Sequence, residues 1–133
     1  MKERRDLVLG LLRKADSDMK ALKATLEAGA FDAAAFHAQQ AAEKFLKAFL
    51  ASAGVDFPYT HNLAKLVELC AEVDTAFQTL VPVVESLTPY AVELRYDSDF
   101  WPSEETVREA RLQALAVRDF VLQRVPTAAG GTG

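Results

Sequence analysis

The chain has 133 residues, half of them hydrophobic, which is enough for one domain with its own core and no need of disulfides or a structural metal. Its formal net charge of −4 creates no overall field that would attract a polyanion, so nucleic-acid binding would require a local basic patch. The single cysteine, Cys70, excludes an intramolecular disulfide, and its place on an apolar helical stripe between acids favours a buried thiol over a nucleophile. The amino terminus is charged and no 18-residue apolar span occurs, so neither a signal peptide nor a membrane anchor is expected. A cytoplasmic location is therefore expected.

Helical periodicity begins at the amino terminus. Apolar residues at intervals of four and three predict a first helix that stops before Gly29, and they are Leu7, Leu11, Ala15, Met19, Leu22 and Leu26. Asp32 is expected to cap a second helix that runs to Gly54. One face of this helix is rich in alanine, which permits the close approach of a neighbouring helix.

The second half of the chain is predicted to be helical as well. Thr60 is expected to cap a third, shorter helix that runs through Cys70. Apolar positions from 75 to 94 keep helical spacing, although Pro82 and Pro89 imply a start, a kink or a break. Ser103, followed by two glutamates, predicts the start of a last helix that continues until Pro126.

These elements together predict an all-α fold. No strand pattern competes, and the mostly short connections favour antiparallel neighbours in an up-and-down bundle of four long helices plus one short helix. Residues 1–126 are expected to form this single domain, and residues 127–133 a disordered tail.

A polar stripe lies on the second predicted helix. Intervals of three, four and three place four of its residues on one face, namely His37, Gln40, Lys44 and Lys47, with Gln39 and Glu43 beside them. In a functional interpretation, Gln40 hydrogen-bonds a base or ribose while Lys44 and Lys47 hold phosphate oxygens as point charges. In a structural interpretation, Glu43 and Lys47 form an ion pair one helical turn apart on a solvated face.

The chain offers little for a metal or a cofactor. His37 and His61 are the only histidines, and a metal site would need a third ligand and a fixed spacing, so no metal is expected. The glycines near the carboxyl end follow no strand and open no helix, so no phosphate-binding loop and no cofactor are expected. His61 lies at a predicted helix amino terminus, where the macrodipole favours a neutral ring that caps or hydrogen-bonds locally; the alternative is a ring that faces a phosphate.

The connection from Arg95 to Pro102 is unusually rich in aromatic and charged residues. Arg95 could hold a phosphate or carboxylate bidentately while Tyr96 stacks on a base, or it could pair with a nearby acid such as Asp97 and bind nothing. Phe100 and Trp101 either plug the end of the bundle or lie in a dimer contact.

Three motifs resemble one family in their order and spacing. They are Phe-His-Ala-Gln-Gln-Ala-Ala-Glu-Lys-Phe-Leu-Lys at 36–47, Thr-His-Asn-Leu at 60–63 and Leu-Arg-Tyr-Asp at 94–97, and they are similar to the HEPN domain family. The resemblance covers most of the chain. It implies a helical bundle, and its members include ribonuclease toxins, nucleotide-binding partners of small nucleotidyltransferases and proteins with no demonstrated chemistry. In this family the matching helix lies near a partner subunit, which implies that Gln40 and Glu43 can also serve dimer contacts.

HEPN ribonucleases resemble one another in an arginine followed four to six residues later by a histidine that helps proton transfer at a ribose 2′-hydroxyl. This chain retains Arg95, but no histidine follows it at that distance: Phe100 and Trp101 stand five and six residues later, Pro102 comes next, and no histidine occurs after His61. The run at 95–97 also resembles the Arg-Tyr-Pro-Asp motif of short HEPN proteins, with Asp97 where proline is usual. The general acid/base expected for RNA cleavage is therefore missing, and no catalytic residue is assigned.

The sequence thus predicts a non-catalytic HEPN-type module for nucleotide binding or interaction. A homodimer is expected, because aromatic residues exceed what one core of this size buries. The family resemblance further implies a small nucleotidyltransferase-type partner in a toxin–antitoxin-like pair. The candidates for binding a nucleotide or RNA are Arg95, Tyr96, Asp97, Gln40, Lys44, Lys47, His37 and His61. Two alternatives stay open: a metal-independent ribonuclease toxin with an atypical site, in which His61 or His37 replaces the missing histidine, and a purely structural assembly bundle.

Overall fold

The computed structural model describes residues 2–91 and 96–126, and within these ranges the chain forms helices and turns with no strand. The long helices are α1 (Lys2–Glu27), α2 (Phe31–Ser52) and α5 (Glu104–Leu122). Between α2 and α5 lie α3 (Leu63–Val73), η1 (Thr75–Leu80), α4 (Val81–Val84) and η2 (Thr88–Tyr90). The all-α prediction is therefore confirmed for the described residues.

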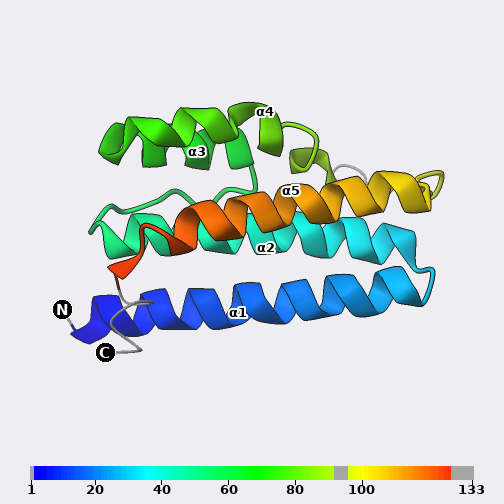
Figure 1. Ribbon diagram of the computed structural model, residues 1–133, viewed down its shortest axis with the longest axis horizontal. Helices are drawn as coiled ribbons and strands as arrows, with labels where there is room; N and C mark the ends of the chain where they lie inside the picture. The colour runs from blue at the N-terminus through cyan, green and yellow to red at the C-terminus, as the bar shows by residue number, and fades with distance from the viewer. Residues whose placement is uncertain (1, 92–95, 127–133) are drawn as a thin grey trace.

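Helix α2 is the centre of the molecule. It contacts α1, α3 and α5, and Figure 1 shows α1 on one side of it and the shorter elements α3 and α4 on the other. Its alanines explain this position, because small side chains let helices approach closely on more than one side. Six alanines of α2 are completely buried: Ala34, Ala35, Ala38, Ala41, Ala42 and Ala48.

Glycines end the first two helices as the sequence suggests. Gly29 has φ +79° and Gly54 has φ +74°, in the left-handed region that residues other than glycine rarely adopt. After each glycine the next amide closes the helix, with Ala30 N donating to Thr25 O at 2.8 Å and Val55 N to Leu50 O at 2.9 Å. The turns that follow return the chain along α1 and then along α2.

Two predicted helix caps are wrong, and one is confirmed. Helix α2 begins after Ala30 without a side-chain cap, so Asp32 lies in its first turn and only complements the helix dipole. Helix α3 is capped by Asn62, whose Oδ1 accepts from Lys65 N at 3.2 Å, whereas Thr60 Oγ1 accepts from Asn62 N at 3.0 Å. At α5 the expected cap is present, because Ser103 Oγ accepts from Thr106 N at 3.1 Å.

The fourth long helix is not formed in the described residues. Its expected range holds η1, α4 and η2, and Pro82 and Pro89 each lie in the first turn of a new short helix. Proline has no backbone N–H and fixes φ, so it starts a helix readily but does not continue one. Three long helices with a layer of shorter ones therefore replace the expected bundle of four long helices. The tail expected at 127–133 lies outside the described residues.

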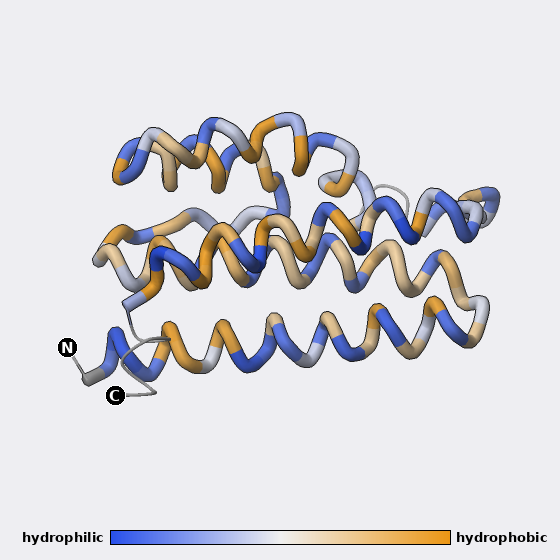
Figure 2. The backbone as a smooth tube through the Cα atoms, in the orientation of Figure 1, coloured by the Kyte–Doolittle hydropathy of each residue, from blue (hydrophilic) through white to orange (hydrophobic). Residues whose placement is uncertain are grey.

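The core joins these layers through aromatic rings. The ring of Phe77 is completely buried, with its centroid 4.4 Å from that of Phe49 and 4.8 Å from that of Phe120, which links η1 to α2 and α5. Figure 2 shows hydrophobic and hydrophilic residues alternating along each long helix, as expected where one face meets a core. Cys70 lies in this core, which confirms the predicted buried thiol, and its burial raises the pKa of the thiol to about 12. No described helix is long and apolar enough to cross a membrane.

Candidate functional site

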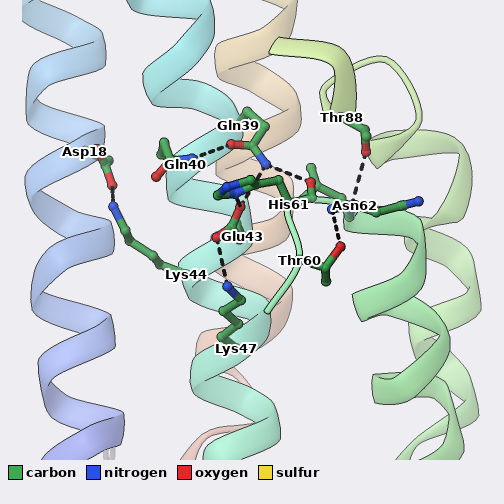
Figure 3. A network of polar contacts seen from close by, with 11 residues as sticks. Asp18, Gln39, Gln40, Glu43, Lys44, Lys47, Thr60, His61, Asn62 and Thr88 are labelled. Carbon is green, nitrogen blue, oxygen red and sulfur yellow. Dashed lines mark hydrogen bonds and ion pairs between the residues drawn. The ribbon is translucent and has the colours of Figure 1, made fainter. Parts of the chain in front are cut away.

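A buried carboxylate organises the polar stripe of α2. Figure 3 shows Glu43 with Lys47 from the next turn of α2 and His61 from the connection before α3. Glu43 Oε2 accepts from Lys47 Nζ at 2.9 Å, and Oε1 accepts from His61 Nδ1 at 2.8 Å and from Gln39 Nε2 at 3.0 Å. The two carboxylate oxygens are thus occupied by three donors of the same chain.

The environment of Glu43 keeps it ionised. Burial alone raises the pKa of this carboxyl, but hydrogen bonds from Lys47, Gln39 and His61 act in the opposite direction, and the net pKa lies below the ordinary value. The predicted pair of Glu43 and Lys47 is present, whereas the predicted solvated face is wrong. The two side chains are 6% and 13% exposed.

Gln39 ties α2 to the segment before α3. Its side chain is completely buried, and Nε2 donates both to Glu43 and to the backbone oxygen of His61, the latter at 3.0 Å. Its Oε1 accepts from Gln40 Nε2 at 2.7 Å. One N–H of the Gln40 side chain is therefore used inside the protein, whereas the functional interpretation of the stripe assigned Gln40 to a base or ribose.

His61 is held in one orientation. A carboxylate only accepts hydrogen bonds, so the contact with Glu43 places a proton on Nδ1 and directs Nε2 away from the network. The His61 side chain is 40% exposed and meets the ring of Tyr59 edge-on, with centroids 6.2 Å apart. The backbone around it is fixed by Leu63 N, which donates to Thr88 Oγ1 at 3.1 Å. The prediction that His61 caps α3 or hydrogen-bonds locally is wrong, because its ring contacts Glu43, 18 positions away on α2, and Asn62 caps α3.

A second buried carboxylate, Asp18 of α1, holds the other half of the stripe. His37 Nδ1 lies 3.0 Å from Asp18 Oδ1, and Lys44 Nζ donates to Asp18 Oδ2. Asp18 is 9% exposed. Sequence reasoning missed this residue, yet a signal existed, since Asp18 follows Ala15 by three positions and precedes Leu22 by four on the apolar stripe of α1.

The described part of the aromatic connection is a turn at residues 97–100 with an exposed aromatic ring on each side, Tyr96 before it and Trp101 after it. Asp97 Oδ1 accepts from Asp99 N at 2.9 Å, and Asp97 O accepts from Phe100 N at 3.0 Å. Phe100 stacks on Tyr90 with centroids 5.6 Å apart and packs against the core, which agrees with a plug. Trp101 does not plug the bundle, because it is 73% exposed, and Tyr96 is 81% exposed.

A pocket of about 510 Å³ lies beside this connection. Its described lining residues include Tyr90, Glu105 and Glu109 but no lysine or arginine. The two carboxylates repel an anion, so these described residues by themselves do not suit a phosphate.

Comparison with known proteins identifies the family. The family model for the HEPN domain matches residues 8–125, which is most of the chain. The chain belongs to the HEPN domain family. A search of curated proteins and a search of solved structures each found no match. Membership supports a nucleotide-interacting or ribonuclease-type module.

The HEPN chain divides its predicted ligand-binding residues among three places. Gln40, Lys47 and His61 join the Glu43 network, and His37 and Lys44 join Asp18. Tyr96 and Asp97 belong to the aromatic connection, while Arg95, the remaining candidate, lies outside the described residues.

The contacts of the HEPN helix also bear on dimerisation and metal binding. Glu43 is enclosed by its own chain, which leaves Gln40 as the more accessible of the two residues assigned to dimer contacts. Within residues 2–91 and 96–126, no three His, Cys, Asp or Glu side chains are arranged to hold a metal ion.

Proposed function

We propose that this HEPN chain is a nucleotide-binding and interaction module without catalysis of its own. It acts as a homodimer with a small nucleotidyltransferase-type partner, in a toxin–antitoxin-like pair. The main support is that Lys44, Lys47 and His37 of the α2 stripe contact buried carboxylates of the same chain, as does His61 from the connection before α3. These four residues therefore stabilise the fold, and a ligand is contacted by other residues.

The energies favour this assignment. If Lys44 or Lys47 turned outward to a phosphate, it would leave Asp18 or Glu43 buried without its cation. Removing one partner of a buried ion pair costs about 3–5 kcal/mol, whereas a hydrogen bond to a charged group contributes about 1.5–3 kcal/mol. The internal ion pairs are therefore more favourable than contacts of the same lysines with a phosphate, and the functional interpretation of the stripe is not supported.

Exposed aromatic rings supply the alternative contact surface. Tyr96 and Trp101 flank the turn after Arg95, and stacking on such rings contributes roughly 1–3 kcal/mol per base with little dependence on base identity. The same rings suit a protein partner, because aromatic residues dominate the energetics of interfaces. From the sequence, Arg95 is the cation expected to hold the phosphate beside them.

Calorimetry with a panel of nucleotides and short RNAs tests the proposal, with an RNA-cleavage assay on the same samples. We expect binding without cleavage, loss of binding by about tenfold or more in Arg95→Ala, and a weaker effect in Trp101→Ala. Arg118→Ala is the matched control, because Arg118 pairs with its neighbour Asp119 on the far half of α5. Cleavage that depends on Arg95 would contradict the non-catalytic assignment, and silence in both assays would favour the assembly bundle.

The oligomeric part of the proposal needs its own experiment. Sedimentation velocity on the wild type should show a dimer, and co-expression with a small nucleotidyltransferase from the same genome should give a complex of defined stoichiometry. Replacing Trp101 with alanine should weaken one of these contacts, because a ring that is 73% exposed in the single chain has area available for burial. A strictly monomeric protein that forms no such complex would count against this part.

One observation favours the ribonuclease alternative. The contact between His61 and Glu43 fixes the imidazole with Nε2 directed away from the network, as in a histidine that acts as a general base with an orienting carboxylate. Under this alternative His61→Ala would abolish RNA cleavage while His37→Ala would retain it. Equal activities in the two variants would argue against a role for the His61 and Glu43 pair.

A further inference from the structure

A basic pocket lies between the last turns of α1 and the first turns of α5. It has a volume of about 200 Å³ and is lined by Lys23, Leu26, Glu27, Arg108 and Arg111. Three cations from two helices thus surround one small space in a chain whose net charge is −4. The acidic pocket beside the aromatic connection has the opposite character.

Arg111 has an unused donor at this place. Its Nε is buried and has no hydrogen-bond partner within the described residues. Other arginines of α5 are paired: Arg108 Nε and Nη2 contact Glu104 Oε2 at 2.8 and 2.7 Å, and Arg118 Nη2 lies 2.9 Å from Asp119. A buried donor without an acceptor destabilises the protein. A ligand oxygen that enters the pocket and draws the guanidinium toward it would give Arg111 Nε the acceptor that it lacks.

The charged residues around the pocket determine whether it favours an anion or a cation. Lys23 is exposed and pairs with no carboxylate in the described part of the chain. Glu27 faces the same space, and Glu104 partly neutralises Arg108, so the cations outnumber the carboxylates by one. The pocket therefore favours an anion, and Glu27 limits the affinity.

We propose that this pocket binds a phosphate group of a nucleotide or of an RNA backbone. Arg111 would hold two phosphate oxygens with its planar fork, and Lys23 would act as a mobile point charge. At about 200 Å³ the pocket is smaller than the roughly 300–1,000 Å³ that encloses a drug-sized ligand, so the base and sugar remain outside. The identification of the phosphate's source rests on the proposed nucleotide-binding function, whereas binding of the anion itself does not.

Titration with pyrophosphate, followed by amide NMR and calorimetry, tests the pocket directly. We expect resonances of α1 near Lys23 and of α5 near Arg111 to shift, and the affinity to fall by about tenfold or more in the double variant Lys23→Gln/Arg111→Gln. The matched control is Lys20→Gln/Arg118→Gln, which removes the same charge from the same two helices at residues that do not line the pocket. Arg111→Lys keeps the charge but not the fork and should bind with intermediate affinity. Melting temperatures of all variants show whether each is folded.

Parallel titrations with a nucleoside diphosphate and a short RNA distinguish the two sources. The source that loses affinity in Lys23→Gln/Arg111→Gln, in step with pyrophosphate, is the one that uses the pocket. Absence of pyrophosphate binding by the wild type, or equal loss in the control variant, overturns the inference. If nucleotide and RNA binding both disappear in Arg95→Ala but both persist in Lys23→Gln/Arg111→Gln, neither source uses the pocket and the inference is overturned, while the proposed function stands. If pyrophosphate and RNA binding both require the two cations, the pocket is supported even if no nucleotide binds.

Discussion

The substitution Glu43→Gln tests whether the polar network holds α2 to the segment before α3. It preserves the size of the side chain and removes the negative charge. The Lys47 ammonium, on a side chain only 13% exposed, would then lie beside a neutral amide, and the His61 Nδ1–H would lose its charged acceptor.

The expected loss follows from the contacts of the two partners. Removing one member of a buried ion pair costs about 3–5 kcal/mol. The loss should lie toward the lower part of this range, because Lys47 Nζ keeps its contacts with two rings, 5.6 Å from the centroid of Phe57 and 5.9 Å from that of Tyr59, of about 0.5–2 kcal/mol. We therefore expect Glu43→Gln to lower the free energy of unfolding by about 2–4 kcal/mol. For a domain of this size, that is a decrease of roughly 8–15 °C in melting temperature.

Urea unfolding at pH 7, followed by circular dichroism, measures this loss. The control is Glu104→Gln, which breaks the ion pair of Glu104 with Arg108 one helical turn away, where the side chains are 55% and 63% exposed. This substitution should lower the free energy of unfolding by less than about 1 kcal/mol. A double-mutant cycle with Lys47→Met should give a coupling energy well above that of the exposed pair. If Glu43→Gln costs no more than Glu104→Gln, the network does not stabilise the fold and the assignment of Lys47 to the structure is refuted.

Further measurements test other contacts. The pKa of Glu43 is lowered in the folded protein, so its ionised carboxylate stabilises the fold fully above pH 4.5, and this stabilisation is lost as the pH falls through the folded pKa. Between pH 7 and pH 3 the free energy of unfolding should therefore fall more for the wild type than for Glu43→Gln. Cys70, with a thiol pKa of about 12, should react with a disulfide reagent at pH 8 only as fast as the protein opens, and immediate reaction of the native protein would contradict its burial. Asn62→Ala should cost about 1 kcal/mol of stability through loss of the α3 cap and Thr60→Ala clearly less, as judged from urea midpoints; the reverse order would assign the cap to Thr60.

The interactions close in sequence were predictable. Apolar spacing identified α1 and α2 together with the start of α5, because helical periodicity places residues three and four positions apart on one face. The Ser103 cap and the pairing of Glu43 with Lys47 are contacts within one turn, so they too follow from local sequence. Local propensity did not decide the segment at 75–90, where each proline fits either a kink or a new helix start.

The tertiary structure decided which polar residues remain available for a ligand. His37 meets Asp18 across 19 positions, His61 meets Glu43 across 18, and Lys44 meets Asp18 across 26. The sequence established an all-helical chain with HEPN motifs and a lysine-rich stripe on its second helix. Whether that stripe faces water or a buried carboxylate depends on where the chain returns, and such distant contacts leave no periodicity in the sequence. The same reason explains the pocket of Lys23, Arg108 and Arg111, whose cations meet only because α5 runs beside the end of α1.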